Sequence, residues 1–177
     1  GRVHIQIFHE ACSQLGNMPA TSARQFITKL AKIIQEDGEI GLLDALLIEK
    51  VKAELNLLPI HRPTSIEEVK PQIVRLIDAL LHVQQLNSAN QLKVRYKILE
   101  RVLSLEELEL YEEISDEPID LGEIMNDIAG LLLRDRLSIL GVAEICLWHD
   151  RIITQDELDV LELLYWLLGF ESAEIVE

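Results

Sequence analysis

Residues 144–170 read EICLWHDRIITQDELDVLELLYWLLGF, an apolar stretch, a short charged loop and a second apolar stretch. Apolar residues recur at helical spacing on both sides of the loop, which predicts two helices. Thr154 to Glu157 has the pattern of a capping box and marks the start of the second helix. Gly169 fits the left-handed position that follows a helix. The stretch therefore predicts a helix–loop–helix unit.

The same unit occurs earlier in the chain, because residues 22–57 align with residues 135–170. The loop positions that agree are Asp37 with Asp150, Ile40 with Ile153, and Asp44 with Glu157. We expect the loop isoleucine to fill the corner between the two helices. A two-helix unit cannot bury its apolar faces alone, so the two copies are expected to pack together or through the helices between them.

The whole chain of 177 residues is predicted to be all-α, with about eight or nine helices in a single domain, 1–177. Proline marks a linker at 58–64, and capping boxes begin at Ser65 and Ser104. Pro71 is expected to shift or kink the helix that Ser65 opens. In the first repeat, Thr21 or Ser22 is expected to cap a helix whose inward residues are Phe26, Leu30, Ile33 and Ile34. The expected helices cover about 3–15, 21–35, 42–57, 66–86, 89–103, a short segment after Ser104, 120–132, 136–148 and 155–168.

The formal net charge is −15, and the segment 104–127 has ten acidic residues without any Lys or Arg. This balance disfavours nucleic acids and anionic membrane surfaces as partners and favours cations or basic protein surfaces. The acidic segment is either a solvated face or a docking surface for a basic partner. The chain has two cysteines, and its sequence shows neither an apolar run long enough to span a membrane nor a signal-peptide pattern. These features indicate a cytoplasmic protein. The chain begins with Gly1, so we expect a fragment or an expression remnant, with more protein upstream.

The repeated helix, Asp-led loop and second helix resemble the TerB-like domain of tellurite-resistance proteins. The resemblance is carried by residues 22–57 and 122–175, and most by the C-terminal copy. Arg151 stands where that family usually has glycine, and Asp44 stands where it usually has glutamate. The wider layout is also similar to the C-terminal extensions of bacterial membrane zinc metalloproteases of the CAAX-protease-like class. Their catalytic HExxH motif is absent here, which implies a non-catalytic piece.

The candidate metal ligands are the loop acids Asp37, Asp44, Asp150 and Glu157. Carboxylates on a turn and on the helix that follows can supply oxygen ligands to a hard cation. The TerB resemblance likewise implies a divalent cation, calcium or zinc. The spacing is not that of an EF-hand, because the repeated acids and the last glutamate of that loop are missing. The alternative is structural: acids at these positions cap loop amides and helix N-termini.

Three further patterns are weaker. His149-Asp150 is a pair found in helical metal-dependent phosphohydrolases, with His82 the nearest upstream histidine. Cys12 and His9 are a possible nucleophile and base on one helix, without a glycine-rich elbow. Trp148, Tyr165 and Trp166 are either core residues or partner contacts, and adjacent Tyr165 and Trp166 cannot both face the core.

We expect a non-enzymatic interaction or sensor module that binds a protein partner, in a stress or membrane-protease context. The alternatives are a regulatory domain of a membrane metalloprotease and a metal-dependent helical hydrolase. The oligomeric state is left open by the sequence.

Overall fold

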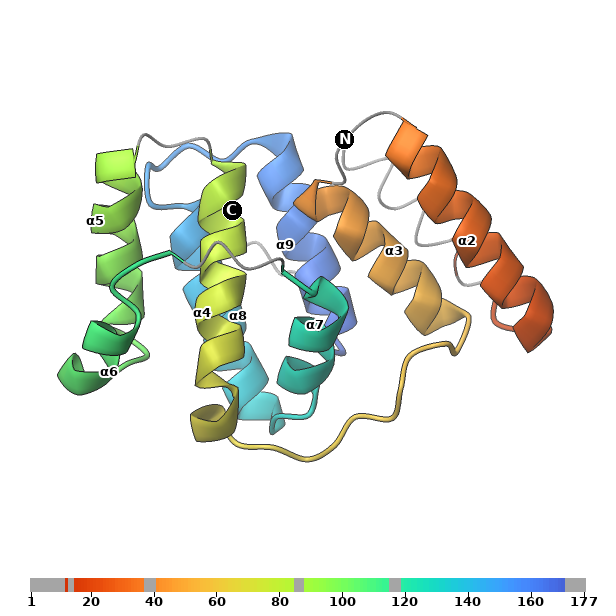
Figure 1. Ribbon diagram of the computed structural model, residues 1–177, viewed down its shortest axis with the longest axis horizontal. Coiled ribbons are helices and arrows are strands. Elements are labelled where there is room, and N and C mark those ends of the chain that lie inside the picture. The colour runs from red at the N-terminus through yellow and green to blue at the C-terminus, as the bar shows by residue number, and fades with distance from the viewer. Residues whose placement is uncertain (1–11, 13–14, 37–40, 85–87, 115–118, 171–177) are drawn as a thin grey trace. The chain divides into compact units, whose positions relative to one another are not determined.

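The protein is all-α, as predicted, and eight helices without any strand are present in the described residues (Figure 1). The computed structural model describes residues 12, 15–36, 41–84, 88–114 and 119–170. The predicted helix at 3–15 lies almost entirely outside these residues. The helices are α2 (Ala20–Glu36), α3 (Leu42–Glu54), α4 (Ile66–Val83), α5 (Ser88–Leu99), α6 (Leu105–Leu110), α7 (Leu121–Ala129), α8 (Leu133–Leu147) and α9 (Gln155–Leu167).

The chain divides into two compact units. The first unit comprises residues 1–60 and 154–177, and so contains α2, α3 and α9. The second comprises residues 61–153 and contains α4 to α8. The first repeat copy therefore lies within one unit, whereas the second copy contributes α8 to one unit and α9 to the other. The expectation of a single domain stays a prediction.

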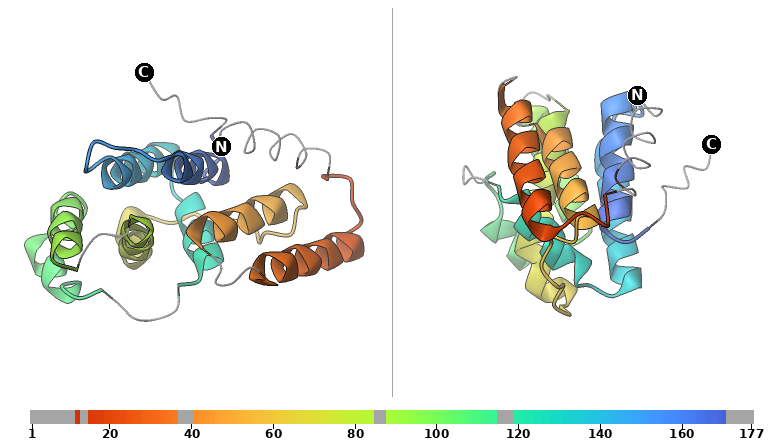
Figure 2. Two further views of the ribbon diagram at one scale, coloured as in Figure 1. Left: turned by 90° about the horizontal axis from the view of Figure 1, so that it is seen from above. Right: turned by 90° about the vertical axis from the view of Figure 1, so that its right-hand side faces the viewer.

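In the first unit, α3 is the central helix and packs against both α2 and α9. Figures 1 and 2 show α2 and α3 side by side. None of the residues of α3 is exposed, so its apolar residues do not need to lie on one face. The core between α2 and α3 is formed by Cys12, Ala23, Val51 and Leu55.

The inward face of α2 differs from the prediction. Phe26 and Ile33 are 37% and 61% exposed, contrary to the prediction. Leu30 packs against the core as predicted, and Ile27, which was not predicted to face inward, does so too. The fully buried Ala23 sets this register, because a small side chain lets α2 and α3 approach closely. The helix also begins at Ala20, so Thr21 and Ser22 lie inside it and do not cap it.

The second helices of the two repeats end in the same hydrogen-bond pattern. After α9, Gly169 has φ of 91° and donates its N–H to the Trp166 carbonyl, while Phe170 donates to Tyr165. After α3, Asn56 has φ of 55° and makes the corresponding bond to Ala53, and Leu57 donates to Lys52. This is the Schellman motif, which requires a left-handed residue and so favours Gly or Asn. The left-handed position predicted for Gly169 is confirmed.

In the second unit, α4 is the central helix and packs against α5, α7 and α8. It begins at Ile66 and continues through Pro71, which is exposed. Ser65 is the N-cap residue, but the predicted capping box is not formed, because the Ser65 hydroxyl donates to Glu68 Oε1 at 3.5 Å instead of accepting from an amide. The neighbouring Thr64 hydroxyl donates to the other oxygen of the same carboxylate at 3.1 Å. The capping box predicted at Ser104 is formed in full.

A buried ion pair joins α4 to α5. Arg95 and Asp78 are 3% and 8% exposed. Arg95 Nε donates to Asp78 Oδ1 at 2.6 Å, and one terminal nitrogen donates to Oδ2 at 3.3 Å. The same guanidinium also donates to the carbonyls of Tyr111 and Glu113, which follow α6. One arginine thus connects three successive helices.

The predicted linker 58–64 contains no helix, but its second half is held against α7. Thr64 N–H donates to the Gly130 carbonyl at 3.1 Å, and His61 Nδ1 lies 2.8 Å from Asn126 Oδ1. A Cβ on Gly130 would lie 2.1 Å from the Arg62 carbonyl oxygen. Glycine is therefore required at 130 by the close approach of the linker backbone.

Replacing Asp78 by alanine tests the buried pair. Asp78→Ala leaves a buried guanidinium without its carboxylate, so the free energy of unfolding should fall by ~3–5 kcal/mol in urea titrations. The control is Arg101→Met at an exposed arginine of the same unit, which should change it by less than ~0.5 kcal/mol. A loss below ~1 kcal/mol for Asp78→Ala would show that the pair is dispensable.

Two glycine substitutions test the close approach at the linker. Gly130→Ala should destabilise the protein by ~1–3 kcal/mol, because the new methyl group overlaps backbone atoms that cannot move alone. Gly141→Ala is the matched control, since a Cβ there meets no atom within 4 Å. It should stabilise α8 by ~0.5–1 kcal/mol through helix propensity. Thermal unfolding of both variants gives the comparison, and equal effects would contradict the steric argument.

Candidate functional site

The charged loop between the two predicted C-terminal helices begins with Asp150, after the end of α8. Its Oδ1 accepts a hydrogen bond from the Ile152 N–H at 3.0 Å, which is an Asx turn. Arg151 adopts a left-handed conformation with φ of 62°. Glycine is the residue that takes this conformation without a steric cost. Ile153, the expected corner residue, is half-buried, and its counterpart Ile40 lies outside the described residues.

The loop ends in a complete capping box at the start of α9. Thr154 Oγ1 accepts from the Glu157 N–H at 3.2 Å, and Glu157 Oε2 accepts from the Thr154 N–H at 2.8 Å. Glu157 is only 5% exposed. In the first copy, Asp44 occupies the same position of the first turn of α3, but the N-cap residue is Gly41 and offers no side chain. Both repeats therefore place an acid three residues after the N-cap.

The four predicted metal ligands do not all belong to one described unit. Asp37 lies outside the described residues, Asp44 and Glu157 belong to the first unit, and Asp150 belongs to the second. In the described ranges, no group of three or more His, Cys, Asp or Glu residues could hold a metal ion. Asp150 and Glu157 both make the capping bonds that the structural alternative requires. The divalent cation stays a prediction.

The other chemical candidates are placed as follows. His149 Nδ1 lies 2.9 Å from the Cys146 carbonyl, within its own helix end. His82 lies in the last turn of α4. Burial, assisted by the negative charge of Glu54, raises the pKa of the Cys12 thiol to about 11. The thiol is therefore protonated at neutral pH and is a poor nucleophile, while His9 lies outside the described residues.

The three aromatic residues of the C-terminal repeat have different environments. Trp166 is buried, and the ammonium of Lys50 lies 5.7 Å from the centre of its ring. Tyr165 is half-buried and meets Phe170 edge-on, with 5.9 Å between ring centres. That contact joins the two residues bonded in the Schellman motif. Trp148, at the end of α8, is 42% exposed and remains available for a contact.

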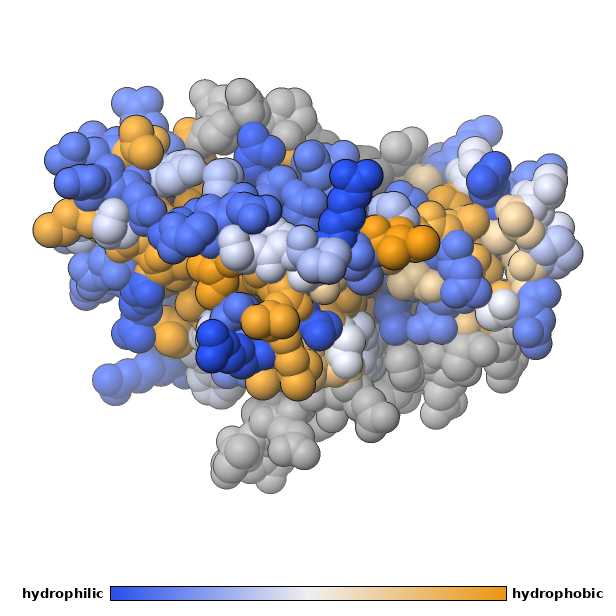
Figure 3. Space-filling view, turned by 90° about the horizontal axis from the view of Figure 1, so that it is seen from below, coloured by the Kyte–Doolittle hydropathy of each residue, from blue (hydrophilic) through white to orange (hydrophobic). Residues whose placement is uncertain are grey.

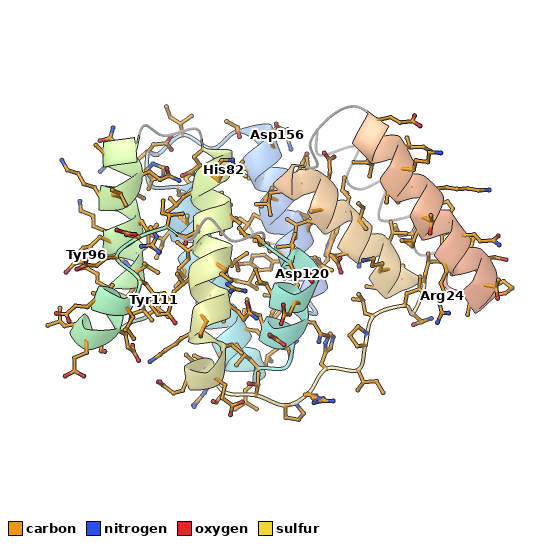
Figure 4. All side chains as sticks on the ribbon, viewed as in Figure 1. Arg24, His82, Tyr96, Tyr111, Asp120 and Asp156 are labelled. Atoms are coloured by element: carbon orange, nitrogen blue, oxygen red, sulfur yellow. The ribbon has the colours of Figure 1, made fainter. Side chains whose placement is uncertain are left out.

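The acidic segment exposes acidic and apolar side chains on and next to α6 and α7, and we call this set of residues the α6–α7 surface. Its exposed acids are Glu106, Glu109, Glu112, Glu113, Asp120 and Glu123. Its exposed apolar residues are Leu105, Leu110 and Ile119, which are 75%, 79% and 44% exposed. Figure 3 shows apolar side chains among hydrophilic ones at the end of the molecule that carries α5 and α6. Figure 4 shows Tyr111 at the end of α6 and Asp120 at the start of α7.

Two sets of interactions fix α6 in place, in addition to the bonds from Arg95 to the carbonyls that follow it. Its capping box closes the N-terminal end, with Glu107 Oε2 accepting from Ser104 N–H at 2.8 Å. Lys70 of α4 donates to Glu107 Oε1 at 2.8 Å and to Glu67 at 2.7 Å. The hydrogen bonds that Lys70 donates, first to Glu107 and then to Glu67, raise the pKa of Lys70, and the bond from Lys70 lowers the pKa of Glu107. Both groups therefore stay charged at neutral pH.

The sequence shows where the acidic segment lies in the chain. It does not show which contacts fix the position of α6. Arg95 looks like any other residue in a basic helix, and nothing in its spacing marks it as buried. The exposed apolar face of α8 could have been found from a helical wheel, because Leu133, Leu137 and Ile145 follow one another at intervals of four and eight residues.

No family model, no curated protein and no solved structure matches this chain. Within the residues that the structure describes, none of the helices has the length and apolarity to cross a membrane.

Metal titration separates the two interpretations of the loop acids. If Asp150 and Glu157 act as caps, Asp150→Asn should change stability by ~1 kcal/mol, equally with calcium, zinc or EDTA. If the acids bind a cation, the EDTA-treated protein should gain melting temperature with rising concentration of that cation, and Asp150→Asn should remove the gain. Differential scanning fluorimetry of both proteins, with Thr154→Ala as the cap-only control, gives the answer.

Proposed function

We propose that this chain is a non-catalytic interaction module whose α6–α7 surface binds a basic, partly apolar segment of a protein partner. The observation that carries the proposal is the composition of this surface. Six exposed acids and three exposed apolar side chains occur on and next to α6 and α7, and no Lys or Arg occurs in residues 104–127. Charge complementarity would speed association, and the leucines would supply the apolar contact.

The rigidity of α6 supports the same proposal. A six-residue helix is not stable by itself in water. Here the capping box, the Lys70–Glu107 bond and the two carbonyl bonds from Arg95 fix its position. A surface that is already ordered loses little conformational entropy when a partner binds.

The proposal also includes a relationship to TerB-like domains and a cytoplasmic location. It places the chain in a stress response or beside a membrane protease. The relationship is supported by the matching Schellman motifs after α3 and α9 and by the acid at the same position of both helices. The location is supported by the two cysteines, which are both buried thiols. The non-catalytic role is supported by the protonated thiol of Cys12.

A defined probe tests the α6–α7 surface. The probe is a synthetic amphipathic helical peptide with lysines on one face and leucines on the other, measured by calorimetry. The triple variant Glu106→Gln, Glu109→Gln and Glu112→Gln should weaken binding by at least ~10-fold, because it removes the local charge. A control triple variant, Glu36→Gln, Glu100→Gln and Asp156→Asn, changes the net charge equally at exposed sites elsewhere and should weaken binding by less than ~2-fold.

Equal losses in the two triple variants would mean that the peptide responds only to net charge. That result, or no binding of the peptide to the unmodified protein, would refute the proposed surface.

A further inference from the structure

The solvent side of α8 carries several large apolar residues beside the exposed Arg134 and Ser138. The exposed residues of this helix and its end include Leu137, Ile145 and Trp148, which are 46%, 38% and 42% exposed, together with Leu133 at 56%. Arg134 lies on the same side with an 85% exposed side chain. A Cβ on Gly141, in the middle of the row, would meet no atom within 4 Å. We call the row Arg134, Leu137, Gly141, Ile145 and Trp148 the α8 face.

The opposite side of α8 is already used. Ile139, Leu140, Ala143, Cys146 and Leu147 are buried, and α8 packs against α4 and α5 in its own unit. The helix therefore carries large apolar residues on both sides, which is unusual for a helix at a protein surface. Contiguous apolar residues on a surface mark a site of interaction.

The α8 face is symmetric about Gly141. Its members lie seven and four residues before Gly141 and four and seven residues after it. In two antiparallel helices that cross at Gly141, Leu137 of one copy lies opposite Ile145 of the other. Arg134 lies opposite Trp148, which suits a guanidinium stacking on an indole ring. The arrangement then repeats by two-fold symmetry, as a closed homodimer requires.

We propose that the α8 face binds the α8 face of a second copy of this chain, antiparallel and with the two Gly141 residues at the crossing point. Glycine permits the closest approach of two backbones at that point. Arg134 is available for the contact, because its ion pair with Asp135 is long, at 3.7 Å, and the Arg134 side chain is exposed. This inference does not depend on the function proposed for the α6–α7 surface.

The net charge of −15 per chain sets the conditions for dimerisation. Two such chains repel each other at low ionic strength, and salt screens the repulsion over ~10 Å at 0.1 M. A single helix pair buries less than ~1,200 Å² in total, so a dissociation constant of micromolar order is expected. The dimer should therefore strengthen with salt, whereas the basic peptide should bind the α6–α7 surface more weakly with salt.

Sedimentation equilibrium of the full chain tests the proposal. Measurements from about 10 µM to about 1 mM protein should show a monomer–dimer equilibrium, with more dimer at about 0.5 M salt than at about 0.05 M. Leu137→Lys and Ile145→Glu should each raise the dimer dissociation constant by at least ~10-fold, because each buries unpaired charges. Leu105→Lys, at an exposed leucine of α6, is the matched control and should leave the dimer unchanged.

Mixing the two variants tests the antiparallel register. Lys at 137 in one chain would then lie opposite Glu at 145 in the other, so the equimolar mixture should form a heterodimer that neither variant forms alone. A parallel pair would not restore association, because identical positions would face each other. Circular dichroism of each variant confirms that these exposed substitutions leave the fold intact. A monomeric unmodified protein at every salt concentration, full dimerisation of Leu137→Lys, or a mixture that stays monomeric would overturn the proposal.

Discussion

The ion pair between Arg95 and Asp78 is the constraint on which the unit of residues 61–153 depends. Two buried charges are costly unless each finds its full set of partners. Arg95 finds two carboxylate oxygens on α4 and two backbone carbonyls after α6. The pair therefore orients α5 on α4 and fixes where the chain leaves α6. Together with the Lys70–Glu107 bond and the capping box, Arg95 fixes the position of α6, since α6 is too short to be ordered by its own hydrogen bonds.

Local patterns in the sequence predicted the helices well, because helix ends are local features. The capping box at Ser104, the capping box at Thr154 and the left-handed Gly169 are all confirmed. Two errors come from tertiary contacts and one is local. The register of α2 is set by the close packing of Ala23 rather than by its largest apolar residues. At Ser65 the difference is local, since the hydroxyls of Ser65 and Thr64 both donate to the Glu68 carboxylate. The burial of Arg95 depends on residues up to 18 positions away, so helical periodicity could not reveal it.

The candidate metal site also shows that a local sequence pattern cannot by itself assign a role to a residue. An acid that follows a loop can bind a cation, cap a helix or accept from a loop amide, and all three roles need the same residue at the same spacing. Asp150 and Glu157 make cap bonds in this structure. The backbone geometry at the ends of α3 and α9 supports the internal repeat better than the positions of the loop acids do. Asn56 and Gly169 differ in sequence, yet both adopt positive φ and close the same pair of hydrogen bonds.

The two proposed surfaces belong to one unit, and their energetics are coupled through charge. The α8 face is carried by a helix that packs on α4 and α5, and the α6–α7 surface is joined to the same two helices by Lys70 and Arg95. Dimerisation brings two strongly acidic chains together, so a basic partner that neutralises the α6–α7 surface also reduces the repulsion between the copies. Thermodynamic linkage is reciprocal, so the dimer must then bind the basic partner more tightly than the monomer does. A weak contact between helices and a charged surface can in this way produce a switch that neither provides alone.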